Sequence, residues 1–107
     1  QQFERLLDVR ATKAIVIDLA RIGGITPWLE VAAMAEERGI SVSGHVIPEV
    51  HVHLVSAVTN GHLVEYLTRS EPILRSRLVL EDGQVVVPKA PGLGIEIDEA
   101  ACSRYRA

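Results

Sequence analysis

Three short apolar runs, each ending at an ionisable residue, constrain the fold of this chain more than any other feature. The runs cover residues 15–18, 41–45 and 62–65, and they end at Asp18, His45 and Glu65. A helical stretch separates the first run from the second. This alternation is typical of repeated β/α units, in which parallel strands deliver polar side chains at their carboxyl ends. We therefore expect the three side chains to converge on one edge of a parallel sheet.

The composition agrees with such a sheet. The chain has 107 residues, of which 48% are hydrophobic and only 4% aromatic, and this length suits one domain or part of a larger one. Val, Leu, Ile and Ala supply most of the apolar side chains, as buried parallel strands covered by helices require. The net charge is −3 and the Lys and Arg residues are scattered, so binding to nucleic acid or to an anionic membrane has no support.

The single cysteine, Cys102, cannot form a disulfide within the chain, so we expect a reducing, cytoplasmic environment. No apolar run approaches the roughly 20 residues needed to span a bilayer, and the first residues do not resemble a signal peptide. The chain also does not begin with Met, and we expect further residues to precede Gln1.

Periodicity and turn residues predict the helix between the first two strands. Thr26 is expected to cap this helix with Pro27 at its first position, after a loop at residues 21–24. Gly39 is expected to end it as a left-handed cap. The buried face is marked by an apolar stripe of Trp28, Val31, Ala32 and Ala35.

The same signals predict the other elements. Helices are expected over residues 3–9 and 49–58, and strands over residues 14–18, 40–44 and 62–66. Farther on, the sequence predicts a hairpin of residues 78–80 and 85–87, and Asp98 is expected to cap a short terminal helix. Three β/α units cannot close a barrel, which takes eight strands and about 250 residues. The fold class is therefore α/β, as either a small open sheet or the last portion of a barrel.

Asp18 and His45 form the sharpest candidate for chemistry. A neighbouring carboxylate orients an imidazole and fixes its tautomer, as a general base or acid requires. The structural alternative is that Asp18 caps the following helix and that His45 fills a structural role. Glu65 could hydrogen-bond a substrate or act as an electrophilic partner when protonated, or it could instead pair with Arg21 or another cation.

Other motifs predict structural roles. His51 and His53 lie two residues apart, and on a helix they would point about 200° apart, too far to share a metal ion. Gly23 and Gly24 lie between a strand and a helix, where an anion could bind, but two glycines alone are weak support for such a site. Cys102 is expected to be an inert thiol.

The order of these motifs resembles the carboxyl-terminal part of the enolase superfamily and, within it, the mandelate racemase-like subgroup. The resemblance rests on Asp18-Leu19-Ala20-Arg21-Ile22-Gly23-Gly24-Ile25-Thr26, then Gly44-His45, then Glu65-Tyr66-Leu67, and then Pro91-Gly92-Leu93-Gly94 before an acidic segment. It extends across essentially the whole chain, in order and with matching gaps.

This resemblance implies a modified TIM barrel, (β/α)7β, in which residues 1–77 form the last three β/α units. Residues 78–107 would return as a hairpin and tail to a capping domain. The implied reaction begins with removal of the proton α to a carboxylate, and Mg²⁺ stabilises the resulting enolate. The resemblance makes His45 the base or acid, Asp18 its orienting partner, and Glu65 the residue that hydrogen-bonds the substrate carboxylate.

The family's three acidic Mg²⁺ ligands and its Lys-x-Lys segment would lie on earlier strands that this chain does not contain. We therefore expect no metal ligand in this chain, and we interpret it as part of a longer enzyme, inactive by itself. The resemblance favours an acid-sugar dehydratase, a lyase acting on a small-molecule carboxylate and assembled as a homo-oligomer. A racemase or epimerase of a 2-hydroxy acid is the alternative. A different class remains open, namely a small non-catalytic α/β domain that binds a partner or an anion at Gly23 and Gly24.

Overall fold

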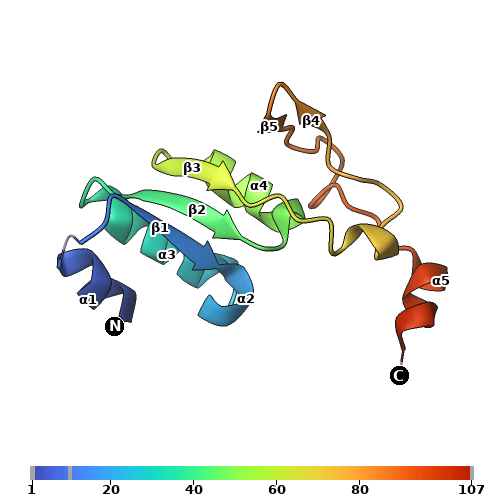
Figure 1. The fold of residues 1–107 in the computed structure, drawn as a ribbon, viewed down its shortest axis with the longest axis horizontal. Helices are drawn as coiled ribbons and strands as arrows, with labels where there is room; N and C mark the ends of the chain where they lie inside the picture. Colours follow the sequence, from blue (N-terminus) through green and yellow to red (C-terminus); the bar gives the residue numbers. More distant parts are fainter. Residues whose placement is uncertain (1, 10, 107) are drawn as a thin grey trace.

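Helices and strands alternate through the first part of the chain and then give way to short, separate elements (Figure 1). The computed structural model describes residues 2–9 and 11–106. In chain order the elements are α1 (Gln2–Asp8), β1 (Ala14–Asp18), α2 (Leu19–Ile22), α3 (Ile25–Glu36), β2 (Ser41–His45), α4 (Pro48–Ala57), β3 (Gly61–Val64), the 3₁₀ helix η1 (Glu71–Ile73), β4 (Leu80–Glu81), β5 (Gln84–Val85), α5 (Glu99–Cys102) and the 3₁₀ helix η2 (Ser103–Tyr105).

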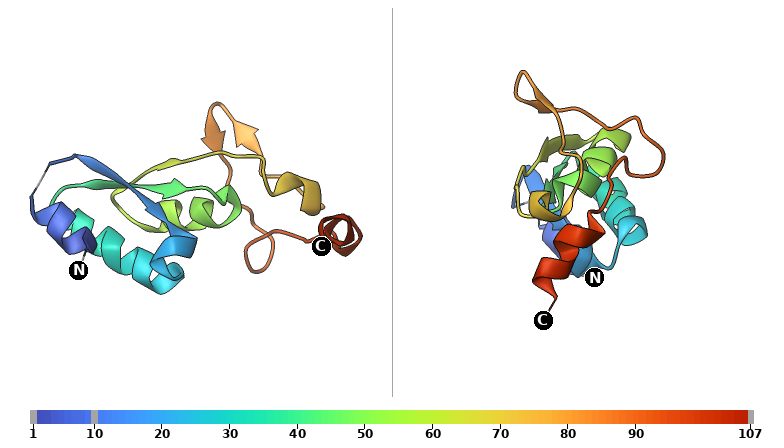
Figure 2. Two further views of the ribbon diagram at one scale, coloured as in Figure 1. Left: turned by 60° about the horizontal axis from the view of Figure 1, so that its bottom comes forward. Right: turned by 90° about the vertical axis from the view of Figure 1, so that its right-hand side faces the viewer.

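The first three strands form one parallel sheet in the order β1-β2-β3. Their carboxyl ends lie at the same edge, toward α2 in Figure 1. Helices α1, α3 and α4 lie on one face of the sheet, as the left view of Figure 2 shows. The β1–β2 ladder pairs Asp18 directly with His45. The predicted α/β fold with parallel β/α units is confirmed.

The core lies between this sheet and its helices. The stripe predicted on α3 is buried in full, and it packs against Ile15 and Ile17 of β1, whose side chains point toward the helices. The alternate side chains of the sheet point the other way, where Val16 is 58% exposed and Leu63 is 59% exposed. The buried cluster consists of Leu7, Ile15, Ile17, Trp28, Val31, Ala32, Ala35, Ile40, Val42 and Leu54.

The start of α3 differs from the prediction. The helix begins at Ile25 rather than after Thr26, and Gly24 occupies the capping position without a side-chain hydrogen bond. The expected loop is also wrong in part, because Arg21 and Ile22 belong to the short helix α2. Gly23 ends α2 at φ 98° and Gly24 follows at φ 118°, so two consecutive residues with positive φ turn the chain from one helix into the next.

The predicted left-handed residue at the other end of α3 is confirmed, although it lies beyond the last helical residue. Gly39 has φ 65° and its N–H donates to the carbonyl of Glu36. The other predicted elements shift by one or two residues. β2 begins at Ser41, α4 covers Pro48–Ala57, and β3 covers Gly61–Val64.

A bulge in the β2–β3 ladder aligns the residues at the ends of these two strands. Val42 pairs with Gly61 and Gly44 pairs with Val64, so three steps along β3 match two along β2. Such an extra residue re-aims the side chains beyond it. Because Gly44 lies opposite Val64, the next residues, His45 and Glu65, come alongside each other.

The chain after β3 forms a hairpin and a returning tail. The hairpin pairs only Leu80 with Val85 and Glu81 with Gln84 as strands, which is shorter than predicted. Asp98 caps α5 as predicted, since its side chain accepts a hydrogen bond from the Ala101 N–H. Among the described residues, no helix has both the length and the apolar character needed to cross a membrane.

Candidate functional site

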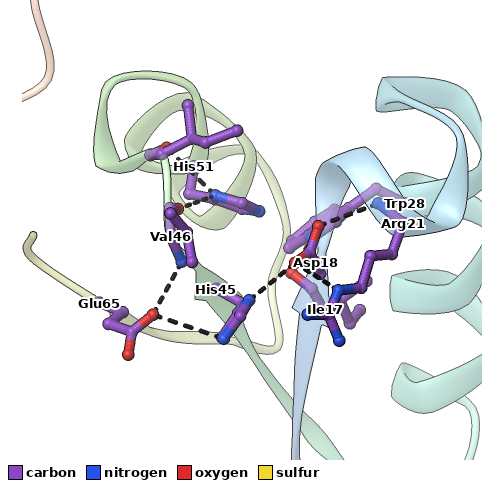
Figure 3. A network of polar contacts seen from close by, with 9 residues as sticks. Ile17, Asp18, Arg21, Trp28, His45, Val46, His51 and Glu65 are labelled. Carbon is purple, nitrogen blue, oxygen red and sulfur yellow. Dashed lines mark hydrogen bonds and ion pairs between the residues drawn. The ribbon is translucent and has the colours of Figure 1, made fainter. Parts of the chain in front are cut away.

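Asp18 and His45 meet at the carboxyl edge of the sheet, where their side chains point toward one another (Figure 3). The Nδ1 atom of His45 lies 2.8 Å from Oδ2 of Asp18. Each residue is the last of its strand, and the two are direct ladder partners. The strand register thus brings the two residues side by side, within reach of a hydrogen bond between their side chains.

Asp18 also caps the helix that comes after it. Its Oδ1 accepts a hydrogen bond of 3.0 Å from the Arg21 N–H, and the Arg21 Nε lies 3.4 Å from Oδ2. The Arg21 N–H, followed by the hydrogen bond with His45, lowers the pKa of Asp18 below its ordinary value of 3.8. The two interpretations of Asp18 are therefore compatible, because one carboxylate makes both contacts.

The contact with Asp18 determines what His45 can do. An ionised carboxylate only accepts hydrogen bonds, so Nδ1 of His45 carries the hydrogen. In the neutral ring, Nε2 then holds a free lone pair and can accept a proton. The His45 side chain is 37% exposed, so a small molecule can approach it.

Glu65 completes a row of three ionisable groups. Its Oε2 lies 3.9 Å from Nε2 of His45 and accepts a 2.8 Å hydrogen bond from the Val46 N–H. The Arg21 side chain, one of the partners considered for Glu65, contacts Asp18 instead. The structure thus brings all three predicted site residues together.

A cleft of about 520 Å³ opens beside the pair. Asp18, His45 and Arg21 contribute its polar side, and Val16 and Ile22 contribute apolar surface. This volume is in the range of sites that bind small molecules. The His45 side chain therefore borders space that a substrate could occupy.

The two histidines of α4 lie apart, as predicted. His51 contacts the carbonyls of Val46 and Ile47 through Nδ1, whereas Nε2 of His53 contacts the carbonyl of Leu93. The two rings thus contact different parts of the backbone and do not converge on one point.

Two buried residues beneath the site were not expected from the sequence to contact it. The Trp28 indole N–H donates to the carbonyl of Ile17, the residue before Asp18. His51 contacts the carbonyl of Val46, the residue after His45. Gly44 was the available signal, since a Cβ there would lie 2.5 Å from two atoms of the His51 side chain.

Comparisons with known proteins identify the fold and its family. A family model described as enolase C-terminal domain-like matches residues 1–101. The chain is 30% identical over 101 residues to L-talarate/galactarate dehydratase of Salmonella typhimurium strain LT2, covering 94% of this chain and 25% of that protein. It is 32% identical over 107 residues to muconate cycloisomerase 1-1 of Acinetobacter lwoffii, covering 91% and 28%.

Solved structures give the same result. The crystal structure of L-talarate dehydratase from Polaromonas sp. JS666, complexed with Mg and L-glucarate, has a TM-score of 0.89 at 34% identity and covers 95% of this chain and 27% of that one. An enolase from Bradyrhizobium complexed with magnesium and mandelic acid has a TM-score of 0.89 at 35% identity, covering 98% and 29%. The chain thus spans little more than a quarter of the length of these relatives. It belongs to the enolase C-terminal domain-like family, and its relatives include acid-sugar dehydratases and mandelate racemase-like members of the enolase superfamily.

Proposed function

We propose that this chain supplies the proton-transfer side of an acid-sugar dehydratase. The observation that carries the proposal is the 2.8 Å contact between Asp18 and His45 at the carboxyl edge of the sheet, beside an open cleft. Relatives named L-talarate/galactarate dehydratase and D-galactonate dehydratase support a sugar acid as the substrate. The protein would remove the proton α to the substrate carboxylate and expel the β-hydroxyl group as water.

Each of the three side chains has a role in this proposal. Nε2 of His45 transfers a proton, either from the α-carbon or to the departing β-hydroxyl. Asp18 keeps the hydrogen of His45 on Nδ1 and so leaves Nε2 free for this transfer. Oε2 of Glu65 is occupied by the Val46 N–H, so a proton on Oε1 would bond the substrate carboxylate.

The residues that the structure describes do not fit a Mg²⁺ site. Among the described residues, no group of three or more His, Cys, Asp or Glu side chains is arranged to hold a metal ion. Both oxygens of Asp18 and one oxygen of Glu65 already contact protein groups. Because related structures contain Mg, we assign the metal ligands of the proposed enzyme to residues outside this chain.

The exposed face of the sheet is consistent with such a larger assembly. Val16 and Leu63 lie uncovered on the face that carries Asp18 and His45. In our proposal this sheet is the last part of a (β/α)7β barrel, and residues 78–107 join a capping domain, in a protein that forms homo-oligomers. In a self-contained domain that binds a ligand at Gly23 and Gly24, this apolar face would remain exposed to water.

Racemisation is the second candidate. The Bradyrhizobium relative, at 35% identity, was crystallised with mandelic acid, a 2-hydroxy acid. Proton removal by His45 would be the first step in either reaction. A racemase would return the proton to the other face of the α-carbon, whereas a dehydratase would lose the β-hydroxyl.

Substitution of His45 tests the proposal in the complete enzyme. His45→Asn should lower the rate by at least about 10²-fold, because general acid–base catalysis contributes roughly 10²–10⁴-fold. The matched control is His53→Asn, since His53 contacts Leu93 of the tail rather than the site. Semicarbazide detects the 2-keto acid of a dehydratase, and optical rotation detects a racemase. Near-normal turnover by the His45 variant would remove this residue from the mechanism.

A further inference from the structure

The turn immediately after His45 has an unusual backbone. Val46 has φ 55° and Ile47 has φ 43°, so two consecutive β-branched residues adopt the left-handed region. This region is strongly disfavoured for side chains that branch at Cβ. Such a conformation persists only where the surrounding structure enforces it. The contacts around this turn therefore have to hold it in place.

Two side chains provide these contacts. His51 donates from Nδ1 to the carbonyl of Val46 at 2.7 Å and lies 3.2 Å from the carbonyl of Ile47. Glu65 accepts from the Val46 N–H at 2.8 Å. The turn is thus held on one side by a buried imidazole and on the other by a residue of the proposed site (Figure 3).

His51 is placed for this contact by the packing around it. The residue is fully buried, and its ring centroid lies 6.1 Å from that of Trp28. Its side chain passes directly beneath Gly44, where any Cβ would collide with it. Carbonyl oxygens only accept hydrogen bonds, so Nδ1 carries the hydrogen, while Nε2 is buried without a partner among the described residues. The polar contacts of the ring are therefore with the turn.

Trp28 makes the corresponding contact under the other strand. Its indole N–H donates to the carbonyl of Ile17 at 3.3 Å, one residue before Asp18. His51 donates to the carbonyl one residue after His45. Each member of the Asp18–His45 pair thus has a buried aromatic ring bonded to the backbone beside it.

We propose that His51 is a positioning residue, which directs the His45 ring toward Asp18 by holding the left-handed turn at Val46 and Ile47. The effect of His51 on the reaction rests on the proposed function, whereas its effect on the position of the His45 ring does not. Without the Nδ1–H donor, the turn would relax toward ordinary backbone angles. The His45 ring would then rotate away from Asp18. Displacements of about 1 Å at a reacting group cost on the order of 10²-fold in rate.

Two substitutions of His51 distinguish the effect of its Nδ1–H donor from the effect of the volume that its ring fills. The side-chain amide of His51→Asn can donate near the place of Nδ1, whereas that of His51→Gln reaches toward the place of Nε2. In the complete enzyme, crystal structures should show the 2.8 Å contact between Asp18 and His45 kept in the Asn variant and lost in the Gln variant. The kcat should fall roughly 10-fold or more for Gln, with a smaller change in KM, and little for Asn.

Contrary results are equally clear. A purely structural His51 predicts that both variants lose rate in proportion to their loss of Tm, and that result would overturn the proposal. So would an unchanged Asp18–His45 contact in the Gln variant. If the wild type turns over no acid sugar, the proposed function fails, whereas the crystal structures still decide the role of His51.

A second pair of variants, which also carry Ile47→Gly, is used if His51→Gln alone does not fold. Both substitutions are then made together with Ile47→Gly, because glycine adopts the left-handed conformation without strain. The turn no longer needs the donor there, so the difference between the Asn and Gln variants should shrink to less than about threefold in kcat. A difference that persists in full would contradict the proposal.

Discussion

The β/α region and the tail of this protein are stabilised in different ways. Every buried residue in the described part of the chain lies at or before Leu54, and none of the described residues beyond it is buried. The first region has a core between sheet and helices, with Trp28 at its centre. The tail instead exposes apolar side chains such as Val79, Leu80 and Ile97. Apolar side chains thus produce a core in only one of the two regions.

Polar contacts fix the tail in place of a core. The Arg75 N–H donates to the Glu96 carbonyl and the Asp98 N–H donates to the Ile73 carbonyl, both at 2.9 Å. His53 links α4 to Leu93 of the tail. The radius of gyration is 15.3 Å, whereas a compact chain of this length has about 13 Å. The proposed site therefore belongs to the region that has its own core, and the tail extends away from that region.

Removing the central side chain of the core should have the largest effect. Trp28→Ala should lower the free energy of unfolding by about 3–5 kcal/mol, because it empties a fully buried site and leaves the Ile17 carbonyl without the indole donor. Denaturant unfolding of the chain of residues 1–107 measures it, because the exposed fractions compared are those of this chain. The control in the tail is Tyr105→Ala, at a side chain that is 67% exposed, with an expected change within about 0.5 kcal/mol. Equal losses at the two sites would refute the distinction between the regions.

Two glycines separate packing from backbone strain. Gly44→Ala should cost about 1–3 kcal/mol, since its Cβ would lie 2.5 Å from atoms of His51. Gly83 in the hairpin has open space but a φ of 79°, so Gly83→Ala should cost about 1 kcal/mol through strain alone. Thermal unfolding measures both. Adding His51→Ala should relieve the packing loss of Gly44→Ala, and additive losses would rule out the collision.

The link between α4 and the tail predicts a smaller, local effect. His53→Leu removes the hydrogen bond to the Leu93 carbonyl, which is worth about 0.5–1.5 kcal/mol. Hydrogen exchange should accelerate around Leu93 while the amides of β1 and β2 stay protected. His62→Leu, at an exposed histidine of β3, is the control and should leave the tail unchanged. Faster exchange throughout the sheet would mean that the two regions unfold together.

The smallest effect should come from two capping aspartates, one in each region. Hydrogen bonds from the Arg21 N–H and from His45 lower the pKa of Asp18, and the Ala101 N–H lowers the pKa of Asp98. Each group therefore contributes stability that is present above its ordinary pKa of 3.8 and lost as the pH falls through its lower folded pKa.

Asparagine at either position keeps a capping oxygen but removes the titration. Urea unfolding between about pH 5 and pH 2 should show a shallower loss of stability for Asp18→Asn and for Asp98→Asn than for the wild type. Identical slopes for Asp18→Asn and the wild type would argue against the lowered pKa of Asp18.

The features that were best predicted from the sequence were those governed by periodicity. The α3 stripe and the parallel alternation depend on local spacing, and both are confirmed. Helix boundaries were less accurate because several residues compete for them. Gly24, rather than Thr26, occupies the capping position of α3. The short helix α2, which Asp18 caps, already covers the preceding residues of the predicted loop.

The surroundings of the site could not be predicted in the same way. The left-handed turn at Val46 and Ile47 opposes the local backbone preference of both residues. It is contacted by His51 from the next helix and by Glu65 from beyond β3. The β2–β3 bulge likewise arises from pairing between distant segments. Neither has a signature in the residues themselves. The convergence of Asp18 with His45, by contrast, is explained by their shared position at strand ends.

The direct pairing of Asp18 with His45 in the β1–β2 ladder has an evolutionary consequence. Neighbouring strands lie about 4.8 Å apart through their backbone hydrogen bonds. Descendants of such a protein can therefore exchange loops other than the turn after β2, and with them the molecules they accept, while inheriting an intact proton-handling unit.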